Sequence, residues 1–268
     1  MKPTLLITFD APELETSLSE SHLSGYSVFE LLGFTGKANL YSEAIQLLKR
    51  ARPDTLLDFS IFSFYCLYTK VKRLFTIFDL LKSFDVKATF FGIAANIDPA
   101  RSTLNELYYN PEIYKKILES GHELGLHGYL HRVPTASDIA ISKTIMRKVL
   151  GITPRTYSTP YGKDDIRLRK ILRDEGFIGW RTWRFDNDFI EKPYMVHYVA
   201  DWSHIDLDKI VKQKEVLAIN CHVYSIFPRF GRFKVMLKGI KQRKIWTPTF
   251  SDFCDSLESE YVLNSNRR

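Results

Sequence analysis

Two histidines and one aspartate are the residues of this chain whose types and spacing most clearly indicate chemistry. His127 and His131 stand four residues apart after a short apolar run, which is about one helical turn, so both imidazoles can point the same way. Neutral imidazole is the commonest protein ligand for a catalytic transition metal. Asp10 ends a second apolar run, Leu5–Phe9. Together these residues predict a metal-dependent hydrolase; the alternative for the histidines is a structural role in a turn.

The elements that must position these residues alternate along the chain. Short apolar runs, typical of strands covered on both faces, are Leu5–Phe9, Ala88–Gly92, Glu123–Leu126, Thr156–Thr159, Ile178–Thr182 and Val216–Asn220. Between them, apolar residues recur at helical spacing over 71–81, 111–118, 141–149 and 166–172. This alternation predicts parallel strands joined by crossover helices, and the number of units favours a barrel over a short open sheet.

One region interrupts this alternation. About sixty residues separate Asp10 from the helical pattern that begins near Lys70, and they include a predicted helix, Tyr41–Ala51, and an aromatic stretch, Phe59–Tyr68. The length of 268 residues suits a single α/β barrel. We therefore expect one domain over 1–268 with an insertion at about 11–69. Loops at the carboxyl ends of barrel strands build active sites, so this insertion would shape the substrate pocket.

Cysteine usage and hydropathy bear on the compartment. Cys66, Cys221 and Cys254 are an odd number at wide spacing, which is not a disulfide framework and favours a reducing compartment. The first strand begins near Thr4, which leaves no room in this sequence for a signal peptide before it. No apolar run reaches the roughly 18 residues of a membrane-spanning helix. These features predict a cytoplasmic protein that is soluble or membrane-peripheral.

Four motifs in order resemble those of the polysaccharide deacetylases, the NodB-homology proteins. They are Thr8-Phe9-Asp10-Ala11, His127-Gly128-Tyr129-Leu130-His131, Ser158-Thr159-Pro160-Tyr161-Gly162, and His222 directly after the apolar run Val216–Cys221. The resemblance covers roughly 2–10 and 74–253. It implies a distorted (β/α) barrel of about seven strands and hydrolysis of acetyl groups from sugars, usually with a divalent metal such as zinc.

The resemblance also implies roles for single residues. His127 and His131 would hold the metal, and Asp10 would take the proton of the attacking water. His222 would protonate the leaving amine; the alternative is a merely buried histidine at a strand end. Amines leave poorly, so such a reaction needs a general acid as well as a nucleophile. Pro160 and Tyr161 would face the substrate, with Tyr161 and its backbone amide helping to hold the oxyanion.

The first departure from the family pattern concerns the metal. Ala11 stands where the family has a metal-binding aspartate. Most catalytic metal sites use three protein ligands. Either Asp10 ligates the metal, or Glu13 or another side chain of the insertion supplies the third ligand.

The second departure concerns the base. Ser158 stands where the family has an arginine that steadies it, and Arg181 or Arg184 could substitute. The same segment carries Asp186 and Asp188, either of which could orient the catalytic histidine; the alternative is a solvated acidic loop. His122, five residues before His127, is expected to make a structural hydrogen bond instead of binding metal.

The leading hypothesis is a metal-dependent deacetylase that removes an acetyl or similar acyl group from an amino sugar. Its substrate would be a nucleotide- or lipid-linked glycan intermediate. Two alternatives remain open. The first is a catalytically impaired barrel that binds glycan or a partner, for which Ala11 and Ser158 are the evidence. The second is a metal-independent hydrolase of C–N bonds in non-sugar amides.

A basic segment lies near the C-terminus. Between Phe227 and Trp246 there are seven basic residues and no acid. On a helical projection its apolar residues cluster on one face, which predicts a barrel helix with a solvated cationic side. The functional alternative is contact with anionic lipid headgroups or a phosphorylated substrate. We expect no nucleic-acid partner, because no recognised motif accompanies the charge.

Overall fold

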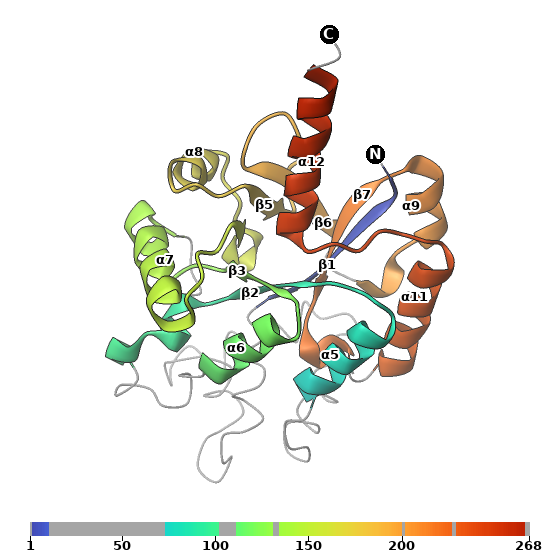
Figure 1. The fold of residues 1–268 in the computed structure, drawn as a ribbon, viewed down its shortest axis with the longest axis horizontal. Coiled ribbons are helices and arrows are strands. Elements are labelled where there is room, and N and C mark those ends of the chain that lie inside the picture. The colour runs from blue at the N-terminus through green and yellow to red at the C-terminus, as the bar shows by residue number, and fades with distance from the viewer. Residues whose placement is uncertain are drawn as a thin grey trace, which may run out of the picture.

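The chain forms a closed barrel of seven parallel strands that follow one another in sequence order (Figure 1). The computed structural model describes residues 2–10, 73–101, 111–130, 134–199, 202–226 and 229–265. The strands are β1 (Thr4–Asp10), β2 (Thr89–Gly92), β3 (Glu123–Leu126), β4 (Thr156–Ser158), β5 (Gly179–Thr182), β6 (Tyr194–Val199) and β7 (Val216–Cys221). Pairing of β1 with β7 closes the barrel. The expected fold class is therefore confirmed. The insertion predicted at 11–69 lies outside the described residues.

Helices surround the barrel. They are α5 (Arg73–Ser83), α6 (Pro111–Glu119), α7 (Ala136–Leu150), α8 (Arg167–Asp174), α9 (Leu207–Gln213), α10 (Val223–Ile226), α11 (Phe230–Gln242) and α12 (Phe250–Ser265). None of the described helices is long and apolar enough to cross a membrane. Between β5 and β6 the chain forms a loop instead of a crossover helix. Strand β6 was not anticipated, because the sequence reading relied on the alternation of strand and helix.

The barrel is distorted because neighbouring strands pair over unequal lengths. Strands β1 and β7 pair over six residues, whereas β3 and β4 are joined only by Leu126 and Tyr157. In β1, side chains alternate between two apolar clusters. Leu5, Ile7 and Phe9 pack in the larger cluster, together with residues of the outer helices. Leu6 belongs to the smaller cluster, with residues of β2, β6, β7 and α12 and with Ile178, which directly precedes β5. Since side chains alternate along a strand, Thr8 and Asp10 point inward with Leu6.

The half-buried carboxylate of Glu123 binds α12 at the amino-terminal end of the barrel. Glu123, the first residue of β3, accepts hydrogen bonds from Thr89 Oγ1 at 2.8 Å and Thr156 Oγ1 at 2.7 Å. It also accepts from the backbone N of Ser251 at 2.9 Å and its Oγ at 2.6 Å. One side chain thus ties β2, β3 and β4 to the first turn of α12, opposite the strand ends that carry the predicted site residues.

His122 differs from expectation. Neither ring nitrogen has a hydrogen-bond partner among the described residues. Instead the imidazole packs against Phe78 and Phe90, with ring centroids 5.5 Å apart in both pairs. The predicted structural hydrogen bond is therefore wrong. Burial, followed by repulsion from Lys87, lowers the pKa of His122 from 6.5 to about 4.

We predict a pH-dependent contribution of His122 to stability. The unfolded chain binds a proton at this ring below about pH 6.5, whereas the folded chain does so only near pH 4, so stability falls as pH drops through this window. Between pH 7 and pH 5 the loss should be about 2 kcal/mol. Urea unfolding of the wild type and of His122→Leu at both pH values measures it. The variant should lose that much less stability, and equal pH dependence in the two proteins would contradict the prediction.

Candidate active site

The predicted site residues that the structure describes come from the carboxyl ends of different barrel strands. Asp10 ends β1, His127 follows β3, and Ser158 ends β4. Arg181 lies in β5, and His222 follows β7 directly. Because all seven strands are parallel, their carboxyl ends meet at one mouth of the barrel, where barrel enzymes place their active sites.

A buried ion pair between Asp10 and Arg181 lies at this mouth. Arg181 Nη2 lies 2.6 Å from both carboxylate oxygens of Asp10. The arginine side chain is 1% exposed and the aspartate side chain 10%. Hydrogen bonds between two ionised groups are shorter and stronger than neutral ones. Of the two arginines considered as replacements for the family's arginine, Arg181 contacts the base. Arg184 is exposed and lies against the Trp183 ring instead, at 5.1 Å.

Polar side chains on β1, β4 and β7 hold the guanidinium of Arg181. Nη2 also donates to Ser158 Oγ at 2.6 Å. Nη1 donates to Thr8 Oγ1 at 2.6 Å and to Asn220 Oδ1 at 3.1 Å. The arginine therefore connects β5 to β1, β4 and β7 within the barrel.

Two aromatic rings complete the surroundings of Arg181. Its Cζ lies 4.4 Å from the ring centroid of Tyr198 on β6 and 5.0 Å from that of Phe91 on β2. An arginine over an aromatic face is attracted by the ring quadrupole, and more strongly when both are removed from water. Arg181 Nε forms no hydrogen bond within the described structure. The rings and the polar partners together restrict the guanidinium to one orientation.

The ion pair keeps the carboxylate of Asp10 charged. Burial acts to raise the pKa of Asp10, but attraction to Arg181, then to His127 and His222, outweighs it and lowers the pKa from 3.8 to about 2. The two imidazoles that influence Asp10 belong to the predicted site. Asp10 is thus an anion throughout the physiological pH range.

His127 is buried and held by a backbone carbonyl. Its Nδ1 lies 2.8 Å from the carbonyl oxygen of Ser158. A carbonyl can only accept, so Nδ1 carries the proton and Nε2 has the lone pair. Burial, partly opposed by Asp10, lowers the pKa of His127 below 6.5 and favours the neutral ring. A neutral imidazole with its second nitrogen bound to a carbonyl is the usual form of a metal-binding histidine.

The complete ligand set cannot be assembled from the described ranges. Within them, no three His, Cys, Asp or Glu side chains gather as a metal site. His131, Ala11 and Glu13, on which the predicted metal site also depends, lie outside the described residues. His127 fits a metal ligand by its donor chemistry, and the remaining ligands stay a prediction.

His222 directly follows β7. It is half-buried, and its Nε2 is 3.5 Å from Nδ2 of Asn220, the residue that also contacts Arg181. Contacts therefore run from His127 through the two Ser158 oxygens to Arg181. From there they continue both to Asp10 and through Asn220 to His222.

The turn after β4 projects an aromatic side chain from the rim of the barrel. Tyr161 adopts φ 57° and is 65% exposed. A non-glycine residue in this left-handed region is strained, and such residues cluster at functional sites. The indole nitrogen of Trp183 donates to the carbonyl oxygen of Gly162 and so ties this turn to the end of β5. Pro160 is buried below Tyr161.

The two acidic residues expected to orient the histidine lie elsewhere. Asp188 pairs with Arg169 at 2.6 Å, and Asp186 is exposed to solvent. A buried aspartate that the sequence reading missed is Asp164, whose Oδ2 accepts a hydrogen bond from the backbone N of Trp183 at 2.9 Å. Burial raises the pKa of Asp164. Asp164 could have been identified from the sequence by its position directly after the predicted motif that ends at Gly162.

Tyr198 and Asn220 were missed as well. Tyr198 lies on β6, a strand that was not anticipated. Asn220 was visible in the sequence as the one amide in the apolar run of β7. A polar residue in a buried strand needs a hydrogen-bond partner, and this rule could have identified it.

We predict that the arginine can be moved to the neighbouring strand. Ser158 and Arg181 are directly paired in the register of β4 and β5, so their side chains share a face. Arg181→Ser should cost about 3–5 kcal/mol, because it leaves Asp10 buried without a counter-charge. The exchange variant, Ser158→Arg with Arg181→Ser, should recover a large part of that loss. Urea unfolding of the three proteins measures it, with Arg184→Ser as the control. An exchange variant as unstable as Arg181→Ser would contradict the prediction.

Comparison with known proteins gives a family match over part of the chain. Residues 69–180 match the family model described as polysaccharide deacetylase. Chitin deacetylase 1 of Saccharomyces cerevisiae is 31% identical over 145 residues, which are 52% of this chain and 40% of that protein. The chain spans less than half the length of the curated relatives it matches.

Two solved structures share the fold. A Mycobacterium smegmatis protein assigned to the polysaccharide deacetylases superimposes with a TM-score of 0.63 at 14% identity, over 97% of this chain and 92% of that one. PuuE allantoinase gives a TM-score of 0.58 at 15% identity, over 95% and 92%. The chain is thus similar to polysaccharide deacetylases in the matched segment, residues 69–180, and in the fold of the barrel.

Proposed function

We propose that this protein is a metal-dependent deacetylase that removes an acetyl or similar acyl group from an amino sugar. Its substrate would be a nucleotide- or lipid-linked glycan intermediate. The observation that carries the proposal is the set of contacts that joins His127, Ser158, Arg181, Asp10 and Asn220 to His222 at one mouth of the barrel. It brings a carboxylate and two imidazoles together, the groups that hydrolysis of an amide requires.

In this proposal Asp10 is the general base. Arg181 contacts both of its oxygens, so the carboxylate is ionised and fixed in orientation before substrate binds. A second cation on the same carboxylate would be repelled by the guanidinium. This favours the base role for Asp10 and leaves metal binding to the imidazoles and one further side chain.

His222 is the proposed general acid. Its position after β7, beside Asn220, places it on the same mouth of the barrel as Asp10 but on a separate strand. A proton donated from there would reach the departing amine while Asp10 receives the proton of water. The strained turn at Tyr161 is the proposed oxyanion contact, with its backbone amide as donor.

His127 and His131 are the proposed metal ligands, with Glu13 as the first candidate for the third. A divalent metal such as zinc, when bound, would polarise the acyl carbonyl and lower the pKa of a bound water toward neutrality. The proton on Nδ1 of His127 leaves Nε2 as the coordinating atom. Ser158 holds this ring and Arg181 at once, so the imidazole and the base are positioned by the same residue.

The contact of Arg181 with Asp10 weakens the case for a catalytically impaired barrel. That alternative rested on Ala11 and Ser158, and a guanidinium at the base removes the second reason. The other reason, Ala11 in place of a metal-binding aspartate, remains. Whether Ala11 prevents metal binding is decided by measuring the metal content of the protein.

We predict acetate release from N-acetylated amino sugars. Purified protein with added zinc should release acetate from N-acetylglucosamine oligomers and from UDP-N-acetylglucosamine, measured by an enzyme-coupled acetate assay. Asp10→Asn and His222→Ala should each lower kcat by at least about 100-fold, the range of a lost general base or acid. His204→Ala, at an exposed position, serves as the control. Hydrolysis of cyclic amides but not of acetylated sugars would favour the non-sugar amidase, and binding without hydrolysis would favour the impaired barrel.

We also predict one metal ion per chain. His127→Ala and His131→Ala should each lower the zinc content measured by elemental mass spectrometry, whereas His204→Ala should retain it. Glu13→Ala should behave like the histidine variants if it is the third ligand. Zinc retained at the wild-type level by both histidine variants would rule out the proposed site.

A further inference from the structure

The outer surface of α11 carries charge that the described protein leaves unbalanced. Phe233, Met236, Leu237 and Ile240 are buried against the barrel, as the amphipathic pattern predicted. The rest of the helix surface carries the exposed basic residues Arg232, Lys234, Lys238 and Lys241, and with Lys244, just after the helix, we call these the α11 basic face.

The other two basic residues of the segment, Arg243 and Arg229, make side-chain contacts within the described protein. Arg243 is neutralised by Asp208, with Nε to Oδ1 at 2.7 Å and Nη2 to Oδ2 at 3.0 Å. Arg229 donates to Ser203 Oγ at 3.3 Å. The five residues of the basic face form no ion pair with any described residue, and no acidic residue lies between Phe227 and Trp246.

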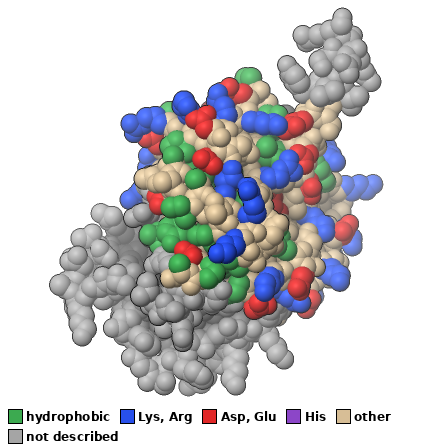
Figure 2. Space-filling model, turned by 60° about the vertical axis from the view of Figure 1, so that its left-hand side comes forward, with side chains coloured by type: hydrophobic (Ala, Val, Ile, Leu, Met, Phe, Trp, Pro, Cys, Tyr) green, Lys and Arg blue, Asp and Glu red, His purple; other side chains and the backbone are tan. Residues whose placement is uncertain are grey.

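Other surfaces of the barrel are different. On the face that Figure 2 shows, basic side chains are interspersed with acidic ones. On α7 and α8, basic residues also form ion pairs, such as Lys143 with Glu175 and Lys170 with Asp174. A solvated helix face of the ordinary kind would show the same mixture, and the α11 basic face does not.

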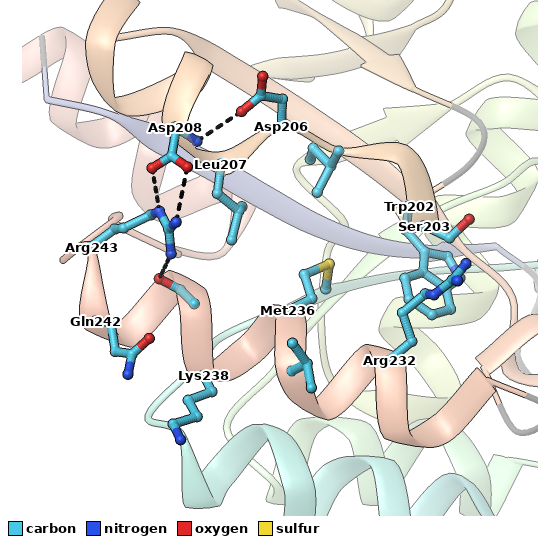
Figure 3. Close-up of a pocket in the computed structure, with 13 residues that line it drawn as sticks. Trp202, Ser203, Asp206, Leu207, Asp208, Arg232, Met236, Lys238, Gln242 and Arg243 are labelled. Atoms are coloured by element: carbon cyan, nitrogen blue, oxygen red, sulfur yellow. Dashed lines mark hydrogen bonds and ion pairs between the residues drawn. The ribbon is translucent and has the colours of Figure 1, made fainter.

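A groove of mixed lining, which includes the carboxylates of Asp206 and Asp208, runs beside the basic face (Figure 3). It lies between α9 and α11, has a volume of about 720 Å³, and includes Trp202, Leu207 and Met236 in its lining. Arg232 and Lys238 also line it. Val235, on the exposed side of α11, is 69% exposed. Cationic and apolar groups thus share one surface.

We propose that this surface docks on an anionic lipid bilayer. From Arg232 to Lys241 the cations extend along roughly 14 Å of helix, which is too long for one phosphate and suits several headgroups. Each Lys or Arg near an anionic membrane adds about fivefold in affinity. Val235 and the groove supply apolar area for the headgroup region. The proposal is independent of catalysis, although a lipid-linked substrate would make use of it.

The test is co-sedimentation of the full chain with vesicles. The probe vesicles contain phosphatidylcholine with 30% phosphatidylserine, and pure phosphatidylcholine vesicles are the reference. The wild type should bind the anionic vesicles and release them at high salt, since exposed charges are screened. Lys234→Gln, Lys238→Gln and Lys241→Gln combined should weaken binding by about two orders of magnitude.

A matched variant removes equal charge from the far side of the barrel. Arg147→Gln, Lys148→Gln and Lys170→Gln change exposed residues of α7 and α8, which lie across the barrel from α11 in Figure 1. This variant should bind like the wild type, and thermal unfolding should show that both triple variants are folded. If both triple variants lost vesicle affinity equally, binding would depend on net charge alone, and the proposal would be overturned. So would absence of binding to anionic vesicles, or displacement by 10 mM inorganic phosphate at constant ionic strength.

Discussion

The ion pair between Asp10 and Arg181 is the interaction on which the rest of the site depends. Two opposite charges withdrawn from water are tolerated only when the geometry is good and the remaining donors are satisfied. Here both carboxylate oxygens contact one guanidinium nitrogen, and Thr8, Ser158 and Asn220 accept further hydrogen bonds from the two terminal nitrogens, whereas Nε has no partner among the described residues. The need to pair and hydrogen-bond these charges therefore constrains side chains on four strands: β1, β4, β5 and β7.

This constraint explains how the site can depart from the motif pattern it resembles while Asp10 still has a counter-charge. The family places its arginine in the motif that contains Ser158 here. Because Ser158 and Arg181 are register partners, a guanidinium rooted on either strand can reach the same space beside Asp10. The serine then gains a different use, since its hydroxyl binds Arg181 and its carbonyl holds His127. What the site requires is a cation beside the carboxylate, and the strand that supplies it can vary.

The two ends of the barrel differ in the kind of contacts they contain. At the amino-terminal end, Glu123 binds the start of α12, and Phe250 and Phe253 pack with Leu6. These contacts are apolar or fully hydrogen-bonded. At the carboxyl end, charged groups, a strained tyrosine and a half-buried histidine share the mouth. A firmly packed base allows costly arrangements to persist at the opposite end, because the surrounding structure holds them in place.

The sequence by itself was sufficient for the strands with strong apolar runs, for the parallel barrel and for the two faces of α11. It also placed Asp10 at the mouth, because these features follow from local periodicity and from the parallel order of strands. The tertiary structure decided which arginine meets Asp10, where β6 lies, and that His122 has aromatic neighbours instead of a hydrogen-bond partner. It also showed that Asp208 neutralises Arg243 while five other cations of that segment form no ion pair with the described residues. These outcomes depend on register and on contacts between segments far apart in the chain, which periodicity does not encode.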